Sequence, residues 1–267
     1  MPSESFAHCG NWKVHYTREG TGPALILLHG GLPGTTGMGA FRHNLEALSR
    51  EFTVYVIDFP GWGRSSKNLN PVDQWSDPLA TAGRVVLAFM EELGISRAHL
   101  MGGSFGAAAA LHAAINSPEK IERLVLIAPG GGVPKPQRLP WPALIELLCY
   151  YDAEGPTIAK FESLARQMVF DPSIHSPKWL REQFQASLDA EVVANPPIRV
   201  PLQMHRRLQT LQKIVRSPVL SRLLPHRFPG AAQALCNDPR LATMQTPVLF
   251  IWGRDDQMQP IECLGSF

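Results

Sequence analysis

The apolar residues of this chain are concentrated in short, nearly uninterrupted runs that are separated by longer amphipathic stretches. Runs of this length that are bounded by Gly, Pro or Asp are typical of strands. The expected strands are residues 12–17, 24–28, 53–57, 98–101, 123–127 and 248–252. Most of them are apolar at successive positions rather than at alternate ones, which predicts a parallel sheet that is buried on both faces.

Helical periodicity fills the gaps between these runs in the first half of the chain. We expect helices at residues 41–50, 79–93 and 105–116, and Gly94 is a suitable C-terminal stop for the second of them. Strand and helix that alternate in this way form βαβ units, because two parallel strands need a crossover connection. The pattern therefore predicts an α/β fold with a doubly wound, mostly parallel sheet.

The alternation is interrupted between residues 130 and 244. Proline is frequent in this part of the chain, and the segments between the prolines are amphipathic, for example residues 178–193. We interpret residues 130–244 as a helical cap inserted into a core formed by residues 1–129 and 245–267. A disordered insertion is the alternative, but the Trp, Leu and Phe content of the segment favours a folded one.

Composition narrows the class of protein further. The chain has 267 residues, of which 45% are apolar and 18% charged, as is ordinary for a globular protein. Its net charge is only +2, and the basic stretch at residues 205–207 is interpreted as a solvated helix face. The N-terminus lacks a signal region, and no apolar run approaches the roughly 20 residues of a membrane span. We therefore expect a soluble cytoplasmic protein without nucleic-acid or membrane partners.

The cysteines give no indication of a metal or redox centre. Cys9, Cys149, Cys236 and Cys263 have neither a CxxC spacing nor a Cys/His pattern that would ligate zinc. Reduced thiols in a cytosolic protein are the simplest interpretation. The sequence implies no metal and no organic cofactor.

The strongest chemical signal is the run Gly102-Gly103-Ser104-Phe105-Gly106. It is a G-x-S-x-G motif that lies between a predicted strand and a predicted helix, the context in which the motif carries a nucleophile. The turn lifts the serine hydroxyl clear of the sheet, and the N-terminus of the following helix favours an oxyanion nearby. Because glycine and serine are common, a simple glycine turn is the alternative, and the strand–helix context makes Ser104 the preferred nucleophile.

A second signal is the glycine-rich run His29-Gly30-Gly31-Leu32-Pro33-Gly34, directly after a predicted strand. Glycines there let backbone N–H groups approach a developing negative charge. Together with the N–H of the residue after the nucleophile, they would form an oxyanion hole worth about 3–4 kcal/mol per donor. His29 need not take part in the chemistry, because a histidine in such a loop more often holds the loop by hydrogen bonding.

A third signal follows the last expected strand, where residues 253–260 read Gly-Arg-Asp-Asp-Gln-Met-Gln-Pro. An acid on this loop can orient a histidine and stabilise its imidazolium form. The spacing from Gly253 and Pro260 favours Asp256 over Asp255. The alternative is that both carboxylates are only turn residues.

Taken together, the runs HGGLPG, DFPGWGRSS, GGSFG and WGRDDQMQP have the order and spacing of the α/β-hydrolase superfamily. Within it the chain most resembles the meta-cleavage-product hydrolases, which cut carbon–carbon bonds of dienoates in aromatic degradation. The resemblance implies a catalytic triad with Ser104 as nucleophile and Asp256 as acid. It implies an oxyanion hole formed by the backbone N–H groups of Gly31 or Leu32 and of Phe105. It also implies a small-molecule substrate beneath a cap domain, and this family often forms homo-oligomers.

Three substrate-binding positions depart from the pattern of the carbon–carbon hydrolases. Gly103 replaces the usual Asn before the nucleophile, and Ala40 stands where a second Asn is typical. Gln183 replaces an Arg of the cap before the aromatic residue Phe184, and Arg181 is an imperfect substitute two residues away. Because these polar groups help to hold a dienoate, an ester or another activated carbonyl compound becomes an equal candidate substrate.

The superfamily order is nucleophile, acid and then histidine, but no histidine follows His226 in this sequence. One interpretation is that the sequence is part of a longer hydrolase whose histidine, last strand and last helix lie beyond Phe267. The other is a noncatalytic protein of this fold that binds ligands without turnover. Earlier histidines such as His99 and His112 are expected to lie away from the nucleophile. Loss of a triad histidine costs on the order of a million-fold in rate, so we predict little activity for this chain. A missing last strand would also leave an unpaired sheet edge, so we predict poor stability.

Overall fold

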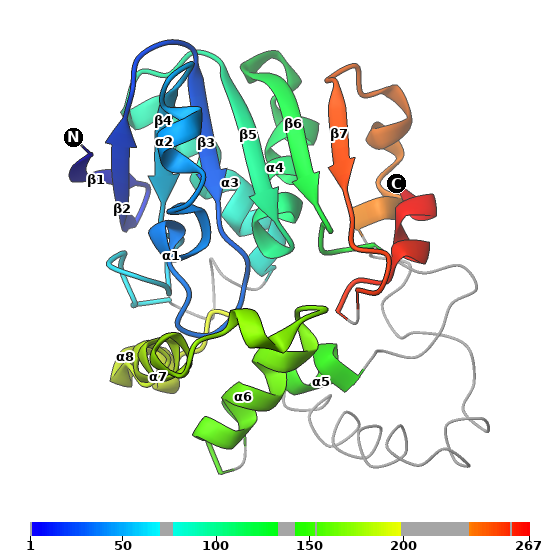
Figure 1. Ribbon diagram of the computed structural model, residues 1–267. Helices are drawn as coiled ribbons and strands as arrows, with labels where there is room; N and C mark the ends of the chain where they lie inside the picture. The colour runs from blue at the N-terminus through cyan, green and yellow to red at the C-terminus, as the bar shows by residue number, and fades with distance from the viewer. Residues whose placement is uncertain (1, 70–76, 133–141, 153, 199–234, 257) are drawn as a thin grey trace.

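A seven-stranded sheet lies at the centre of the structure, a computed structural model that describes residues 2–69, 77–132, 142–152, 154–198, 235–256 and 258–267 (Figure 1). The order across the sheet is β1 (Ser3–Cys9), β2 (Trp12–Glu19), β4 (Thr53–Ile57), β3 (Ala24–Leu28), β5 (Ala98–Gly103), β6 (Ile121–Ile127) and β7 (Val248–Ile251). β4, β3, β5, β6 and β7 are mutually parallel, whereas β1 and β2 join as an antiparallel edge. The predicted α/β fold with a mostly parallel sheet is confirmed.

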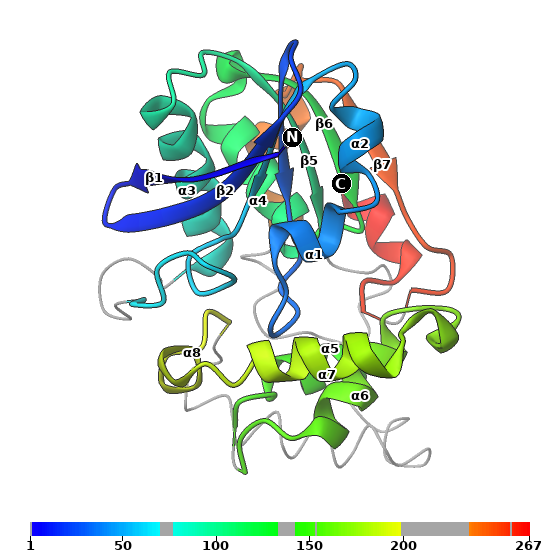
Figure 2. The same cartoon turned by 60° about the vertical axis from the view of Figure 1, so that its left-hand side comes forward.

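Helices cover both faces of this sheet (Figure 2). α3 (Pro78–Glu92) and α4 (Phe105–Asn116) share a hydrophobic core with one face, and α1 (Gly37–Phe41) and α2 (Leu45–Leu48) pack on the other over β3 and β4. The runs that were apolar at successive positions need this arrangement, because each strand then buries side chains on both faces. The helices predicted at residues 79–93 and 105–116 are confirmed, and Gly94 does end α3, with φ +64°.

The prediction of a single helix at residues 41–50 is wrong in its bounds. The structure has two short helices in its place, and α1 begins four residues earlier, at Gly37. Thr36 caps α1, because its hydroxyl oxygen accepts the N–H of Gly39 at 2.8 Å. The early start of α1 therefore depends on a capping hydrogen bond, which the spacing of apolar residues does not reveal.

β1 is a strand that the hydrophobic pattern did not predict. It pairs with β2 along its full length, from Ser3 opposite Arg18 to Cys9 opposite Trp12, and the two strands are joined by a two-residue turn. The Gly-Asn dipeptide of this turn, in which Gly10 has φ +61°, was the available signal for a hairpin.

A second group of helices lies beyond the carboxyl ends of the parallel strands in both views (Figures 1 and 2). It contains α5 (Pro142–Leu148), α6 (Ile158–Gln167), α7 (Pro177–Ala186) and α8 (Ala190–Ala194). The helix expected at residues 178–193 is thus divided, because Asp189 caps a new helix start by accepting the N–H groups of Glu191 and Val192. Residues 199–234, which include the basic stretch at 205–207, lie outside the described residues. The extent of the cap, residues 130–244, stays a prediction.

Short 3-10 turns connect these elements. They are η1 (Pro118–Lys120), η2 (Pro172–Ile174), η5 (Leu235–Asn237), η6 (Pro239–Thr243) and η7 (Ile261–Ser266). None of the helices in the described part of the chain is long and apolar enough to cross a membrane.

A buried carboxylate, that of Asp58, joins the elements that carry the loops at the carboxyl edge. One of its oxygens accepts the N–H of Gly37 at 2.7 Å, and the other accepts the N–H of Arg64 at 3.0 Å and contacts His15 Nδ1 at 2.9 Å. The hydroxyl of Ser65 donates to the Asp58 carbonyl at 2.6 Å. Only 4% of Asp58 is exposed, so these partners replace the water that the charge lost on folding.

Asp58→Asn is expected to lower the free energy of unfolding by about 2–3 kcal/mol. The amide cannot accept at both ends, so at least one buried donor loses a charge-assisted bond. The matched control is Asp77→Asn. Among the described residues, the exposed Asp77 side chain accepts the N–H of Ala80 alone, at 3.1 Å, and its loss should cost less than about 1 kcal/mol. Urea denaturation measures both, and equal losses would contradict the assigned role of Asp58.

Candidate active site

Ser104 lies between the end of β5 and the start of α4, in a backbone conformation that side chains rarely adopt. Its φ is 50° and its ψ is −108°, in the left-handed half of the map. The turn is held on both sides, because Ser104 N–H donates to Ile127 O at 2.8 Å and Ser104 O accepts from Gly130 at 3.0 Å. A strained residue that neighbouring elements hold so firmly is typical of a functional position.

Glycines on either side make this turn possible. A Cβ atom on Gly102 would lie 2.5 Å from the backbone of Gly106, and a Cβ atom on Gly106 would lie 2.2 Å from Leu28 O. Gly103 is different, because a Cβ atom there would meet no atom of the described residues within 4 Å. The motif therefore contains two glycines that the backbone requires and one that leaves open space next to Ser104.

The glycine-rich loop after β3 lies directly against this turn. Cβ positions built on Gly30 and Gly31 are 3.8 Å from Ser104 Cβ and 3.3 Å from Phe105 Cβ, respectively. Within the described part of the chain, the backbone N–H groups of Gly31, Leu32 and Phe105 donate to no acceptor. Unpaired N–H groups in a nearly buried position are rare, and they are suited to binding an anion.

His29 holds this loop to its neighbour. Its Nδ1 is 2.7 Å from Gly30 O, and its Nε2 accepts the N–H of Phe59 at 2.9 Å, so the proton must be on Nδ1. Complete burial lowers the pKa of the His29 ring below its ordinary value, although the Asp58 carboxylate partly opposes the shift. The ring is therefore neutral, and both of its nitrogens form hydrogen bonds that hold the loop, which is the role expected from the sequence.

Asp256 lies on the loop that follows β7, at the same carboxyl edge and two strands from β5. Its Oδ1 accepts the N–H groups of Met258 at 2.7 Å and Gln259 at 2.8 Å. The indole N–H of Trp252 donates to Gln259 O at 2.6 Å and closes the same loop. The carboxylate is thus fixed by the backbone of its own loop.

The two candidate acids on this loop differ in how far they are buried. Asp256 is half-buried, whereas Asp255 is exposed and lies 3.7 Å from the guanidinium of Arg254. The buried Met258 belongs to a cluster of side chains from α5 and α6. Asp256 therefore has the more enclosed position of the two, and its role as the acid stays a prediction.

α7 places the predicted cap residues next to the glycine-rich loop. A Cβ atom on Gly34, which has φ +74°, would lie 2.1 Å from Gln183 O, so loop and helix are in direct contact. Phe184 and Leu32 both pack against the cluster of α5 and α6 side chains, and the rings of Phe184 and Phe161 are 6.4 Å apart. The helical segment thus contacts one of the loops that surround Ser104.

The other positions that depart from the family pattern lie nearer to solvent. Both Ala40 and Arg181 are exposed. Gln183 Nε2 comes within 3.9 Å of a Cβ position on Gly39, close to the start of α1. The structure therefore brings Gly103 and Gln183 to the edge of the site and gives Arg181 no described contact with it.

Among the described residues, no histidine hydrogen-bonds to Ser104 or Asp256. His112 lies against α3, where a Cβ atom on Gly83 would be 2.6 Å from His112 Cβ. His205 and His226 lie outside the described residues. The general base of the site is therefore not assigned by the described geometry.

Two roles at this edge were not predicted from the sequence. Asp58 anchors the loops, and Trp62 donates its indole N–H to Leu32 O at 3.2 Å. Both belong to the run DFPGWGRSS, which carried the family resemblance but had no assigned function. A buried aspartate directly after a predicted strand was the available signal.

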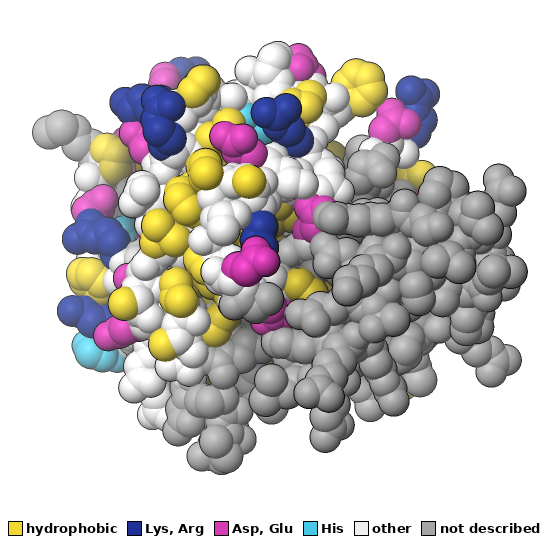
Figure 3. All heavy atoms as spheres, turned by 90° about the horizontal axis from the view of Figure 1, so that it is seen from below, with side chains coloured by type: hydrophobic (Ala, Val, Ile, Leu, Met, Phe, Trp, Pro, Cys, Tyr) yellow, Lys and Arg dark blue, Asp and Glu magenta, His cyan; other side chains and the backbone are white. Residues whose placement is uncertain are grey.

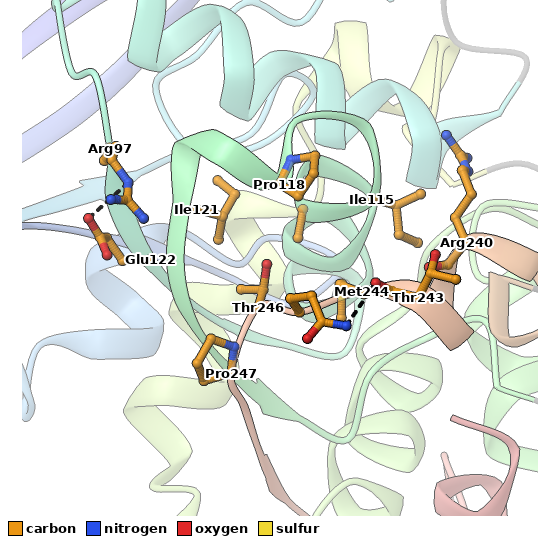
Figure 4. Close-up of a pocket in the computed structure, with 12 residues that line it drawn as sticks. Arg97, Ile115, Pro118, Ile121, Glu122, Arg240, Thr243, Met244, Thr246 and Pro247 are labelled. Carbon is orange, nitrogen blue, oxygen red and sulfur yellow. Dashed lines mark hydrogen bonds and ion pairs between the residues drawn. The ribbon is translucent and has the colours of Figure 1, made fainter.

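Features outside this edge do not add to the site. A cavity of about 560 Å³ lies between the end of α4, the start of β6 and residues 240–247, at the amino-terminal side of the strands (Figure 4). Its two arginines are paired, Arg97 with Glu122 at 3.0 Å and Arg240 with Asp238 at 2.6 Å.

Seen from the side of the helical segment, the described acidic, basic and hydrophobic side chains are intermixed (Figure 3). In the described part of the chain, no group of His, Cys, Asp or Glu is placed to hold a metal ion.

Known proteins resemble this chain in both sequence and fold. The family model of the alpha/beta hydrolase fold matches residues 23–266. A 2-hydroxy-6-oxononadienedioate/2-hydroxy-6-oxononatrienedioate hydrolase of Burkholderia vietnamiensis strain G4 is 32% identical over 252 residues, which covers 94% of this chain and 77% of that protein.

Solved structures agree at the level of the fold. The 2-hydroxy-6-oxo-6-phenylhexa-2,4-dienoate hydrolase from Rhodococcus sp. strain RHA1 superposes with a TM-score of 0.74 at 23% identity, covering 100% of this chain and 86% of that one. A carboxylesterase from Bacillus subtilis superposes with a TM-score of 0.60 at 21% identity, covering 95% of this chain and 74% of that one. A dienoate hydrolase and a carboxylesterase thus have the same fold as this chain.

Gly106→Ala is expected to destabilise the protein by about 3 kcal/mol or more, because its methyl group would collide with the backbone of Leu28. Gly103→Ala is the matched control within the same motif and should change stability by less than about 1 kcal/mol. Thermal and urea denaturation measure both variants. A tolerated Gly106→Ala would mean that α4 does not depend on this close approach.

Proposed function

The chain belongs to the alpha/beta hydrolase fold family, and from this premise we propose that it is a serine-dependent hydrolase of a small carbonyl compound. In this proposal Ser104 is the nucleophile and Asp256 the acid that orients a histidine. The backbone N–H groups of Gly31 or Leu32 and of Phe105 form the oxyanion hole. The helical segment between residues 130 and 244 covers the substrate.

One observation carries the proposal, namely the strained backbone of Ser104 beside the N–H groups of Gly31, Leu32 and Phe105, which have no acceptor among the described residues. The φ of 50° is a conformation that side chains rarely adopt, and the contacts at Gly30 and Gly31 bring the second loop to Ser104 and Phe105. A plain glycine turn would need neither a serine at this point nor unpaired donors next to it. The combination is suited to acyl transfer, in which negative charge develops on a carbonyl oxygen.

The reaction follows from these positions. Ser104 Oγ adds to the carbonyl carbon while a base takes its proton, and the oxygen that becomes negative is bound by the N–H groups. Collapse of this adduct breaks the bond to the leaving group, which leaves with a proton, and an acyl-serine remains. Water then hydrolyses the acyl-serine. A dienoate would first be converted to its keto form, so that the leaving carbon carries a stabilised negative charge.

Two substrate classes are supported by different observations. The Burkholderia relative is named for a dienedioate and trienedioate, which favours a ring-cleavage dienoate as substrate. Gly103 and Ala40 lack the amides that typically hold such a compound, and Gln183 lacks the positive charge of the usual Arg, which favours an ester. The open space at Gly103 lies next to the nucleophile, so this position is the most direct test of the choice.

We expect a fluorophosphonate probe to label this chain slowly, at Ser104, and added imidazole to accelerate the labelling. The described histidines give Ser104 no base, and a positioned base contributes roughly 10²–10⁴-fold, part of which a diffusible base can recover. Labelling is followed by intact-protein mass spectrometry. The Ser104→Ala variant must lose it at every imidazole concentration.

Three other outcomes of this experiment have distinct meanings. Labelling that persists in Ser104→Ala would rule out Ser104 as the nucleophile. Fast labelling without imidazole that is lost in His205→Ala or His226→Ala would assign the base to that histidine. Folded protein that binds carbonyl ligands but is never labelled would support the noncatalytic alternative.

Gly103→Asn is expected to raise turnover of a ring-cleavage dienoate, relative to turnover of a p-nitrophenyl ester, by about fivefold. The amide occupies open space beside Ser104 and adds one hydrogen bond to the dienoate, worth about 1 kcal/mol. Gly103→Ala is the control for a side chain without the amide. The ratio is measured with imidazole present, from the decay of dienoate absorbance and the release of nitrophenol, and a fall in the ratio would favour an ester as substrate.

A further inference from the structure

Trp62 contacts both halves of the proposed oxyanion hole. It lies on the loop after β4 and is only 3% exposed. Its indole N–H donates to Leu32 O at 3.2 Å, and its ring lies 5.1 Å from the ring of Phe105 at an interplanar angle of 48°. Leu32 and Phe105 carry N–H groups from the two sides of the site, so one side chain connects them.

The glycine-rich loop has few other restraints at this point. Leu32 O also accepts the N–H of Thr35 at 3.1 Å, which is a turn within the loop itself. His29 restrains the loop two residues earlier, at Gly30. The bond from Trp62 is therefore the described side-chain hydrogen bond that fixes Leu32 to another element of the core.

The backbone of Trp62 is itself held in place. Its N–H donates to Phe59 O at 3.0 Å, and Gly61 N–H donates to Ser66 O at 2.8 Å. Gly61 and Gly63 have φ +92° and +51°, conformations that permit the tight turn around the indole. The loop thus presents the indole from a fixed base.

Aromatic rings pack against the indole, which belongs to the main hydrophobic core. The rings of His29 and Phe105 lie against it at 5.5 and 5.1 Å, but Trp62 also lines a cavity of about 510 Å³, together with Lys67, Asp189 and Val192. The hydrogen bond to Leu32 O connects this buried ring to the glycine-rich loop.

We infer that Trp62 is a positioning residue that sets the geometry of the oxyanion hole through its indole N–H. The inference rests on the proposed function, because it assigns a role within that site. Trp62 does not touch the reacting atoms in this account. It acts through the backbone of Leu32 and the ring of Phe105, so its loss should slow the chemical step more than it weakens ground-state binding.

The test uses the full chain with a tryptophan analogue at position 62 in which sulfur replaces the indole N–H, so that ring size is kept. Trp62→Phe is the second variant, and Trp179→Phe in α7 is the control for loss of an indole elsewhere. Hydrogen exchange is measured by mass spectrometry on the peptide that contains residues 30–36. The rate of Ser104 phosphonylation is measured in parallel with imidazole present.

We expect the analogue to accelerate exchange in residues 30–36 and to slow phosphonylation by roughly tenfold to a hundredfold, the range for a misplaced catalytic group. The melting temperature and the affinity for a noncovalent substrate analogue should be nearly unchanged, since packing is preserved. A purely structural role would instead lower the melting temperature and change exchange throughout the protein.

Unchanged phosphonylation in the analogue overturns the inference, whether or not the loop exchanges faster. Failure of the proposed function has a different signature, because the unsubstituted chain would then either never be labelled or keep its labelling in Ser104→Ala. The exchange measurement remains valid in that case and still shows whether Trp62 holds the loop. The two failures are therefore distinguishable in one set of samples.

Discussion

The start of α4 depends on a single close approach, in which the backbone of Gly106 lies against the carbonyl of Leu28. No side chain fits between them, since even a Cβ atom would lie 2.2 Å from the oxygen. This contact brings the first turn of α4 to the end of β3, the strand from which the glycine-rich loop departs. The unusual backbone of Ser104 and its proximity to Gly30 follow from it, because the chain must reverse within one residue.

Buried polar groups then hold the loops that this contact brings together. Asp58 links the start of α1, the loop at Arg64 and β2, and the neutral His29 links the glycine-rich loop to Phe59. Such groups are costly to bury without partners, so each of them specifies one arrangement of its loop. Trp62 adds a third restraint of the same kind. Side-chain hydrogen bonds thus hold the loops at the carboxyl edge, whereas apolar packing holds the helices against the sheet.

The contact between α7 and the glycine-rich loop connects substrate selection with catalysis in the proposed enzyme. Gly34 lies against the carbonyl of Gln183, and Leu32 packs with Phe184 in the hydrophobic cluster of α5 and α6. Met258, two residues after Asp256, belongs to the same cluster. A change in the packing of the helical segment would therefore shift the loop of the proposed oxyanion hole and the loop of the proposed acid.

The sequence by itself determined the parallel sheet, the main helices and the family, because these depend on local periodicity and on motifs whose residues are neighbours in the chain. Ser104 and Asp256 were chosen in this way. Asp256 is half-buried and Asp255 exposed, and the role of Asp256 as the acid stays a prediction. β1 was not predicted, since a half-exposed edge strand has little apolar signal, and the helix at residues 41–50 was misplaced because a cap at Thr36 outweighed periodicity. Only the tertiary structure decided the roles of Asp58, Trp62 and Gly34. Their partners lie on other elements, and a buried hydrogen bond or a close backbone approach between distant segments leaves no periodic trace in a sequence.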